Sequence, residues 1–263
     1  MKWPSAPWRR DDSKRRDRSS SAHASTKDHP QIPPDFPDTV RRLNYLVDRL
    51  GIARYLEIGL GNGGTFDAVH APHKVGVDPH PWNRDLHDIH GVHILTSDEY
   101  FKRHWDEGQR FDLILLDGLH TAEQTYRDFV NSLHFAHANT VWLIDDVMPN
   151  DAFSAIPDQD EAVRQRKATG SDNTAWHGDV YKVVWMIKTF HRGMRLRTFW
   201  KQQPQSLVYY SNAAGVGPSL DLTFAEISQL TFDDTQTRRA EYDIGDERDI
   251  LDECIEAIKH REK

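Results

Sequence analysis

The sequence predicts an α/β protein with one doubly wound, mostly parallel sheet. Short apolar runs recur between residues 55 and 144, each of the length expected for a strand that is buried on both faces. Helical or loop segments separate these runs, and strands that alternate with helices imply right-handed crossovers and a parallel sheet. The 263 residues suffice for one large domain of this kind with appendages.

The chain divides into three predicted parts. Residues 1–36 are rich in Arg, Lys, Asp, Ser and Pro and hold almost no aliphatic residues, so we expect a disordered basic tail. Such a tail could also attach weakly to an acidic partner or membrane surface. Residues 37–212 form the predicted α/β domain. Residues 213–263 form a predicted helical extension that is acidic and ends in an amphipathic helix near residues 250–258.

The elements of the domain follow from the spacing of apolar residues. Residues 39–50 have the spacing of a helix, and Gly51 follows where such a helix would end. Between the last two of five apolar runs, residues 121–138 form a predicted helix, which Thr121 and Gln124 could begin as a capping box. The five runs predict strands at residues 55–58, 74–77, 92–95, 111–116 and 141–144.

The pattern changes after the fifth run. Residues 150–176 are polar and irregular, which is typical of a lid or a substrate wall. A helix is predicted over residues 180–191, with Asp179 as its N-cap. Two further strands, residues 195–200 and 206–210, are joined by a short connection and predict a hairpin at the sheet edge.

Composition narrows the function classes. The formal charge of −8 argues against a general nucleic-acid binder, because such proteins bind phosphates through many Lys and Arg side chains. Cys254 is the sole cysteine, which favours a reducing compartment. No apolar run reaches the length of a membrane-spanning helix, and residues 1–30 lack a signal-peptide core. We therefore expect a cytoplasmic protein without membrane insertion.

Candidate binding residues follow the first three runs, since ligands of open α/β sheets lie beyond the carboxyl ends of the strands. The first run is followed by a glycine-rich loop, whose backbone can turn tightly and approach a ligand. Asp78 ends the second run, where an acidic side chain can accept the ribose hydroxyls of an adenosine, although a turn residue is an equal alternative. Ser97 and Asp98 follow the third run, where a short polar group could meet an adenine amino group.

Three carboxylates follow the fourth and fifth runs: Asp117, Asp145 and Asp146. Adjacent strand ends would bring them together, and unpaired anions at close range raise one another's pKa. A hard divalent cation with oxygen ligands, such as Mg²⁺, would relieve this repulsion. The alternative is that one or two of them cap loops or pair with Arg. His120 lies three residues after Asp117, where a neutral imidazole could take a proton from a substrate hydroxyl.

These residues together resemble the class I S-adenosylmethionine-dependent methyltransferases, over about residues 39–212. That family has a seven-stranded Rossmann-like sheet closed by a final hairpin, and its first three strand ends hold the methionine, ribose and adenine parts of the cofactor. The loop reads Gly-x-Gly-x-Gly-Gly rather than the Gly-x-Gly-x-x-Gly of nicotinamide enzymes. The resemblance implies that S-adenosylmethionine is bound by Glu57, Gly59, Gly61, Asn62, Gly63, Asp78, Ser97, Asp98 and Asp117.

The carboxylates also resemble those of the metal-dependent O-methyltransferases of the catechol type, which implies that Asp117, Asp145 and Asp146 bind Mg²⁺. Catechol enzymes usually have Lys where this chain has His120. The Asp-Gly-x-His motif is instead similar to a bacterial methyltransferase group with a following Tyr and Asp, for which Tyr126 and Asp128 are the matching residues. This resemblance implies that His120 is the catalytic base, and Trp176 and His177 could line the acceptor pocket.

We therefore expect a metal-assisted O-methyltransferase that acts on a sugar or another small-molecule hydroxyl, the acceptor resting on family analogy alone. A nicotinamide-dependent oxidoreductase, a metal-independent methyltransferase acting on nitrogen or carbon, and a non-catalytic cofactor-binding protein are the alternatives. The expected partner is a small-molecule or glycan acceptor. The acidic C-terminal helices could also form a homodimer contact.

Overall fold

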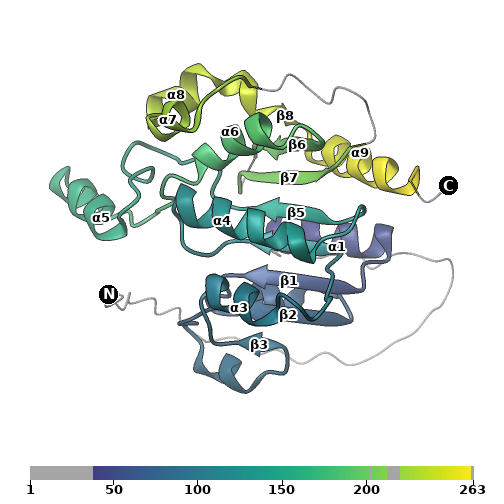
Figure 1. Cartoon of the computed structure of the whole chain (residues 1–263). Coiled ribbons are helices and arrows are strands. Elements are labelled where there is room, and N and C mark those ends of the chain that lie inside the picture. Colours follow the sequence, from purple (N-terminus) through teal and green to yellow (C-terminus); the bar gives the residue numbers. More distant parts are fainter. Residues whose placement is uncertain (1–37, 202, 212–219, 262–263) are drawn as a thin grey trace, which may run out of the picture. The chain divides into compact units, whose positions relative to one another are not determined.

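The fold is built on a mixed sheet, seen in a computed structural model that describes residues 38–201, 203–211 and 220–261 (Figure 1). The basic tail predicted for residues 1–36 lies outside these residues. The described part of the chain forms an eight-stranded sheet in the order β3-β2-β1-β4-β5-β7-β6-β8. The strands are β1 (Arg54–Ile58), β2 (His73–Val77), β3 (Val92–His93), β4 (Leu113–Leu116), β5 (Val141–Ile144), β6 (Met194–Phe199), β7 (Gln205–Tyr210) and β8 (Ile244–Gly245).

The strand directions confirm the predicted doubly wound sheet. Strands β1 to β5 pair in parallel, and β7 runs antiparallel to both β5 and β6. The strand order reverses between β1 and β4, because β2 and β3 extend the sheet to one side and β4 and β5 to the other. Their carboxyl ends therefore border the crevice in which open α/β sheets bind ligands.

Helices cover both faces of the sheet. They are α1 (Asp38–Leu50), α2 (Gly64–Ala68), α3 (Ser97–His104), α4 (Ala122–Ser132), α5 (Gln159–Ala168), α6 (Tyr181–Phe190), α7 (Phe224–Ser228), α8 (Phe232–Thr237) and α9 (Glu247–Lys259). Short 3-10 helices span Arg84–Asp88, Leu133–Phe135 and Arg239–Tyr242. None of the helices in the described ranges has the length and apolar character needed to cross a bilayer.

Two apolar clusters form the core, one on each face. In β4, Ile114 and Leu116 join the cluster that contains residues of α3, α4 and α6, whereas Leu113 and Leu115 join the cluster with α1, α2 and α9. Alternate residues of a strand point to opposite faces, so an unbroken apolar run is required where both faces are covered. This explains why β4 and β5 were readable from the sequence.

The structure corrects three predictions. The sheet has eight strands rather than seven, because β8 pairs in parallel with β6, and the β6–β7 hairpin is therefore not its edge. The region of residues 150–176 contains α5, which Asp158 caps by accepting the N–H of Glu161. Asp179 is not the N-cap of α6; its Oδ1 accepts the N–H of Ala122, the first residue of α4.

Candidate active site

The glycine loop, residues 59–64, connects β1 to α2. Gly59 has a φ of 89°, and a Cβ there would lie 1.9 Å from the carbonyl oxygen of Asp117. The N–H of Asp117 also donates to the carbonyl of Ile58 at 2.9 Å. Any side chain at residue 59 would therefore push the loop away from the end of β4, so glycine keeps these two predicted binding segments together.

Asp78 follows β2 and holds the glycine loop. Its Oδ2 accepts the N–H groups of Leu60 at 2.9 Å and Gly61 at 3.2 Å, and its Oδ1 accepts the N–H of His80 at 2.7 Å. Asn62 Oδ1 accepts the N–H of Gly64, and Gly63 is the residue that precedes α2. The structure thus shows Asp78 holding the loop at Leu60 and Gly61, and its role toward a ribose stays a prediction.

Trp82 is a residue at this loop that sequence reasoning missed. Its side chain is 80% exposed, and its ring is the nearest group to the position that a Cβ would take at Gly61, at 3.8 Å. The backbone N–H of Trp82 donates to the carbonyl oxygen of Gly61 at 2.8 Å. An exposed aromatic ring held beside such a loop is a ready surface for stacking a flat ligand. The only sequence signal was its place four residues after Asp78.

Glu57 lies beneath the loop and is 1% exposed. Its Oε2 accepts the hydroxyl of Tyr55 at 2.7 Å. Burial raises the pKa of Glu57 to about 8, the Tyr55 hydrogen bond opposes the shift, and the negative charge of Asp117 adds to it. The carboxyl group is therefore linked electrostatically to the end of β4.

Ser97 and Asp98 occupy the first turn of α3, after Thr96 has capped the helix. Ser97 Oγ accepts from the amide of Gln124 at 3.2 Å, and Asp98 pairs with Arg127 at 2.9 Å. Both contacts are to α4. Both predicted adenine-binding residues therefore contact side chains of α4. Their role toward a cofactor stays a prediction.

Asp117, His120 and Asp146 form the Asp–His–Asp cluster. Nδ1 of His120 lies 2.9 Å from Oδ2 of Asp146, and Nε2 lies 3.5 Å from Oδ1 of Asp117. Each residue offers one ligand atom, and these atoms lie within 4.8 Å of one another. The arrangement can orient an imidazole as a base, and it can hold a divalent cation between the two carboxylates.

The two carboxylates change the protonation of His120. Burial alone would lower the pKa of His120, but the charges and hydrogen bonds of Asp146 and Asp117 raise it well above 6.5. The pKa of Asp146 is lowered although burial opposes this, because His120 lies beside it. The pKa of Asp117 is raised, chiefly by burial. The resting cluster therefore favours an imidazolium paired with Asp146.

Asp146 adopts an uncommon backbone conformation, with a φ of 60°. For a residue with a side chain this region costs roughly 1–2 kcal/mol, although Asp tolerates it better than most. Strain of this kind often marks a functional site. Here the conformation accompanies the contact between the Asp146 carboxylate and His120.

Asp145, the third predicted metal ligand, is not part of the cluster. It is 3% exposed, and its Oδ2 accepts the side-chain amides of Gln203 at 2.7 Å and Gln205 at 2.9 Å. Its Oδ1 accepts the N–H of Asp146 at 2.8 Å. Sequence reasoning missed the two glutamines, which come from the β6–β7 connection and β7.

A wall beside His120 is formed by residues 176–178. Trp176 stacks on His120 with ring centroids 4.9 Å apart, and its carbonyl lies 3.4 Å from Nδ1 of His120. Nε2 of His177 lies 3.8 Å from Oδ1 of Asp146. Gly178 has a φ of 59°, and a Cβ there would lie 1.6 Å from the carbonyl oxygen of His120. Trp176 and His177 thus lie beside His120, and their role in an acceptor pocket stays a prediction.

Tyr126 and Asp128, matched to the bacterial group by sequence, have other partners. The hydroxyl of Tyr126 lies 3.0 Å from Nε2 of His191. Asp128 accepts from the amide of Gln124 at 2.9 Å, and burial raises its pKa to about 7. The structure brings neither residue into the Asp–His–Asp cluster.

The chain is similar to known methyltransferases. Residues 56–147 match a family model described as a methyltransferase domain, which is about a third of the chain. The matched stretch contains the glycine loop, Asp78 and all three members of the Asp–His–Asp cluster. No curated protein matches the chain in sequence.

Solved structures that match the chain do so at low identity and with TM-scores below 0.5. An O-methyltransferase from Bacillus cereus in complex with SAH is 16% identical, with 68% of this chain and 81% of that chain covered and a TM-score of 0.44. The O-methyltransferase TomG from Streptomyces achromogenes, in complex with SAM, is 16% identical, with 64% and 78% covered and a TM-score of 0.43. The SAH-bound methyltransferase PaMTH1 from Podospora anserina is 15% identical, with 68% and 83% covered and a TM-score of 0.44.

Proposed function

Because residues 56–147 match a methyltransferase domain, we propose that this chain is a class I, S-adenosylmethionine-dependent O-methyltransferase that acts on a hydroxyl of a sugar or another small molecule. The observation that carries the proposal is the position of His120 between Asp117 and Asp146 at the carboxyl ends of β4 and β5. A paired imidazole at the ligand crevice suits the removal of a hydroxyl proton.

The residues of the glycine loop fit S-adenosylmethionine. Gly59 keeps the loop against the end of β4, and Asp78 presents a carboxylate at the neighbouring strand end. Trp82 adds an exposed ring beside Gly61. When bound, the cofactor supplies an electrophilic methyl group whose sulfonium becomes a neutral thioether after transfer.

His120 is the proposed base. Asp146 orients the ring through Nδ1, as a carboxylate orients the histidine in a catalytic triad, and Nε2, which faces Oδ1 of Asp117 at 3.5 Å, is the nitrogen that would take the hydroxyl proton. The acceptor oxygen then forms its bond to the methyl carbon as the proton moves to Nε2. His120 must first lose the proton that its raised pKa favours, so turnover is expected to rise with pH above neutrality.

Asp117 and Asp146 also fit a divalent cation such as Mg²⁺, with Asp145 left out because its oxygens already accept three N–H groups. A cation at these carboxylates would orient the acceptor and favour its alkoxide form. It would also lower the pKa of His120 by adding positive charge nearby.

His177 supports a polar acceptor. Its Nδ1 is buried, and among the described residues it has no hydrogen-bond partner. An unpaired buried polar atom costs about 1–3 kcal/mol, which a bound hydroxyl would relieve. Sugars carry several hydroxyls, and aromatic rings such as that of Trp176 pack well against them.

The first experiment is calorimetric titration of S-adenosylmethionine into the protein, with Mg²⁺ and then with a chelator, followed by a screen of glycans and aryl alcohols for methylation. Binding together with an O-methylated product supports the proposal. Binding with methylated amines only would favour a metal-independent N-methyltransferase, in which the carboxylates hold the amine. Binding of S-adenosylmethionine without turnover, both with Mg²⁺ and with chelator, would favour a non-catalytic cofactor-binding protein.

A further inference from the structure

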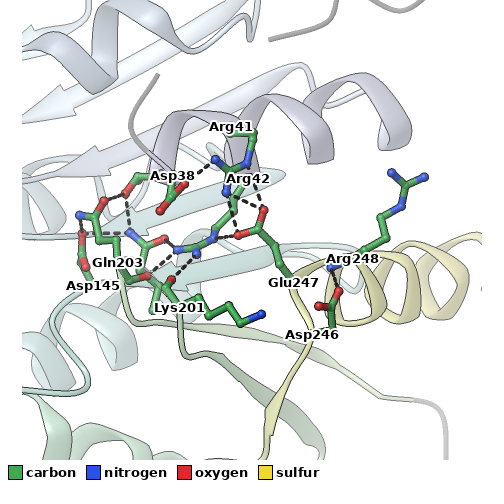
Figure 2. A network of polar contacts seen from close by, with 11 residues as sticks. Asp38, Arg41, Arg42, Asp145, Lys201, Gln203, Asp246, Glu247 and Arg248 are labelled. Carbon is green, nitrogen blue, oxygen red and sulfur yellow. Dashed lines mark hydrogen bonds and ion pairs between the residues drawn. The ribbon is translucent and has the colours of Figure 1, made fainter. Parts of the chain in front are cut away.

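Asp145 lies at one end of a buried hydrogen-bond chain that begins on the C-terminal helix (Figure 2). Oε2 of Glu247, the first residue of α9, accepts from Nε of Arg42 at 2.8 Å. Nη1 of Arg42 donates to Oε1 of Gln205 at 2.7 Å, and Nε2 of Gln205 donates to Oδ2 of Asp145 at 2.9 Å. Arg42 is 1% exposed and Gln205 is 0% exposed, so water cannot replace the contacts of Gln205 with Arg42 and Asp145, whereas the Glu247 side chain is 31% exposed.

Arg42 determines the donor and acceptor of each hydrogen bond that leads from it to Asp145. A guanidinium has donors only, so Gln205 must turn its oxygen to Arg42 and its NH₂ group to Asp145 and Thr39. Because Thr39 Oγ1 accepts from Gln205, its hydroxyl donates onward to Oε1 of Gln203 at 2.8 Å. Gln203 must then turn its own NH₂ group to Asp145.

This direction decides what Asp145 can bind. Its Oδ2 faces two NH₂ groups, and a cation approaching that oxygen would meet their hydrogens. Its Oδ1 accepts the N–H of Asp146, the residue with a φ of 60°. The carboxylate of Asp145 is therefore held by two glutamine amides through Oδ2, and its Oδ1 holds the backbone from which the Asp146 side chain reaches His120.

We propose that Arg42, Gln203 and Gln205 are positioning residues, which hold Asp145 against the backbone of Asp146 and thereby aim the Asp146 carboxylate at His120. The inference rests on the proposed function. The glutamines contact Asp145, and Asp145 in turn contacts the backbone N–H of Asp146. The same hydrogen bonds also connect Glu247, in the predicted C-terminal extension, to the Asp–His–Asp cluster through Arg42.

The test variant is Gln205→Met, which keeps the length of the side chain and removes both hydrogen-bonding groups. The matched control is Thr198→Val, which removes the buried hydrogen bond between Thr198 and Ser206 in the same hairpin and leaves the chain intact. Gln203→Met, at the partly exposed hairpin connection, is a second variant that removes one of the two donors to Asp145.

Three measurements separate the outcomes. Long-range ¹H–¹⁵N spectra, assigned with His120→Gln, report the hydrogen bond of the His120 ring without any acceptor. Calorimetry and turnover on a screened acceptor report function. We expect Gln205→Met to move the His120 signals and to lower kcat about 10–100-fold, with the Kd for S-adenosylmethionine within about twofold of wild type. Thr198→Val should leave all three unchanged, and Gln203→Met should fall between them.

Signals and kcat that respond equally to Gln205→Met and Thr198→Val would overturn the positioning role, while the proposed function would stand on wild-type binding and turnover. If the wild-type protein binds no S-adenosylmethionine, the proposed function is wrong. The proposed positioning of a catalytic base by Arg42, Gln203 and Gln205 would then be wrong as well.

Discussion

The two sides of the crevice are held in different ways. At the ends of β1 and β2, the contacts are made mainly by backbone atoms. N–H groups of the glycine loop donate to Asp78, and Gly59 lies against the carbonyl of Asp117. At β4 and β5, side chains hold side chains: His120 contacts Asp117 and Asp146, and glutamines from the β6–β7 region hold Asp145.

This difference separates a local construction from a long-range one. The glycine loop and Asp78 are 17 or 18 residues apart in the sequence, and their pattern can be read from one βαβ unit. Asp145 and Gln205 are 60 residues apart, and Arg42 and Gln205 are 163 apart. Substitutions on one side of the crevice should therefore leave the other side largely intact.

The largest expected effect separates chemistry from cofactor binding. His120→Ala should lower kcat by about 10²–10⁴-fold, because the acceptor hydroxyl loses its base. The affinity for S-adenosylmethionine should stay within about twofold, since the glycine loop is untouched. Steady-state kinetics and calorimetry measure the two quantities. Tyr126→Phe, which removes only the contact with His191, is the control. Full turnover by His120→Ala would exclude the base assignment.

A second prediction concerns Glu57, which is buried at the end of β1 and feels the charge of Asp117. Its pKa in the folded protein, about 8, is above the ordinary 4.5, so its stabilising effect is fully present below pH 4.5 and is lost as pH rises to 8. Relative to wild type, Glu57→Gln should gain a few kcal/mol in the free energy of unfolding between pH 5 and 8. Urea denaturation at several pH values measures this difference. A pH-independent difference would show that Glu57 is ionised in the folded protein.

The third prediction tests the backbone-held side. Asp78→Ala should weaken the binding of S-adenosylmethionine by about 10–100-fold, because a charged hydrogen-bond acceptor is lost and two loop N–H groups are released. The His120 signals in ¹⁵N spectra should change little, since the Asp–His–Asp cluster keeps its own contacts. Calorimetry measures the affinity. Unchanged affinity would mean that the cofactor is bound elsewhere.

The smallest effect is expected at Asp98. Its carboxylate already pairs with Arg127, so Asp98→Ala should change the affinity for S-adenosylmethionine by less than about twofold, as expected for the loss of an exposed ion pair. The same titration measures it. A loss as large as that of Asp78→Ala would instead support the adenine contact that the family resemblance implies.

Much of the fold could be predicted from the sequence because both faces of β4 and β5 are buried and every residue in them is apolar. Strand β8 could not, since it has two residues and depends on pairing with β6. That Asp117, His120 and Asp146 lie close together could also be predicted, because they follow two neighbouring strands. The sequence could not distinguish Asp145 from Asp146, because that distinction depends on Gln203, Gln205 and Arg42, which are distant in the chain.

The same reason explains Asp179. Its place before α6 suggested a local cap, whereas its Oδ1 accepts from the first turn of α4, 57 residues away, and its Oδ2 pairs with Lys182 of α6 at 3.1 Å. The local partner is near in the sequence, but the partner in α4 is not.

The wall beside His120 has a consequence for how the acceptor range can change. Trp176 donates to the carbonyl of Ile156, the N–H of His177 donates to the carbonyl of Ser154, and Gly178 lies against His120. The segment that carries α5 is therefore fastened at both ends. Substitutions on the exposed face of α5 should therefore leave the contacts that hold residues 176–178 beside His120 in place.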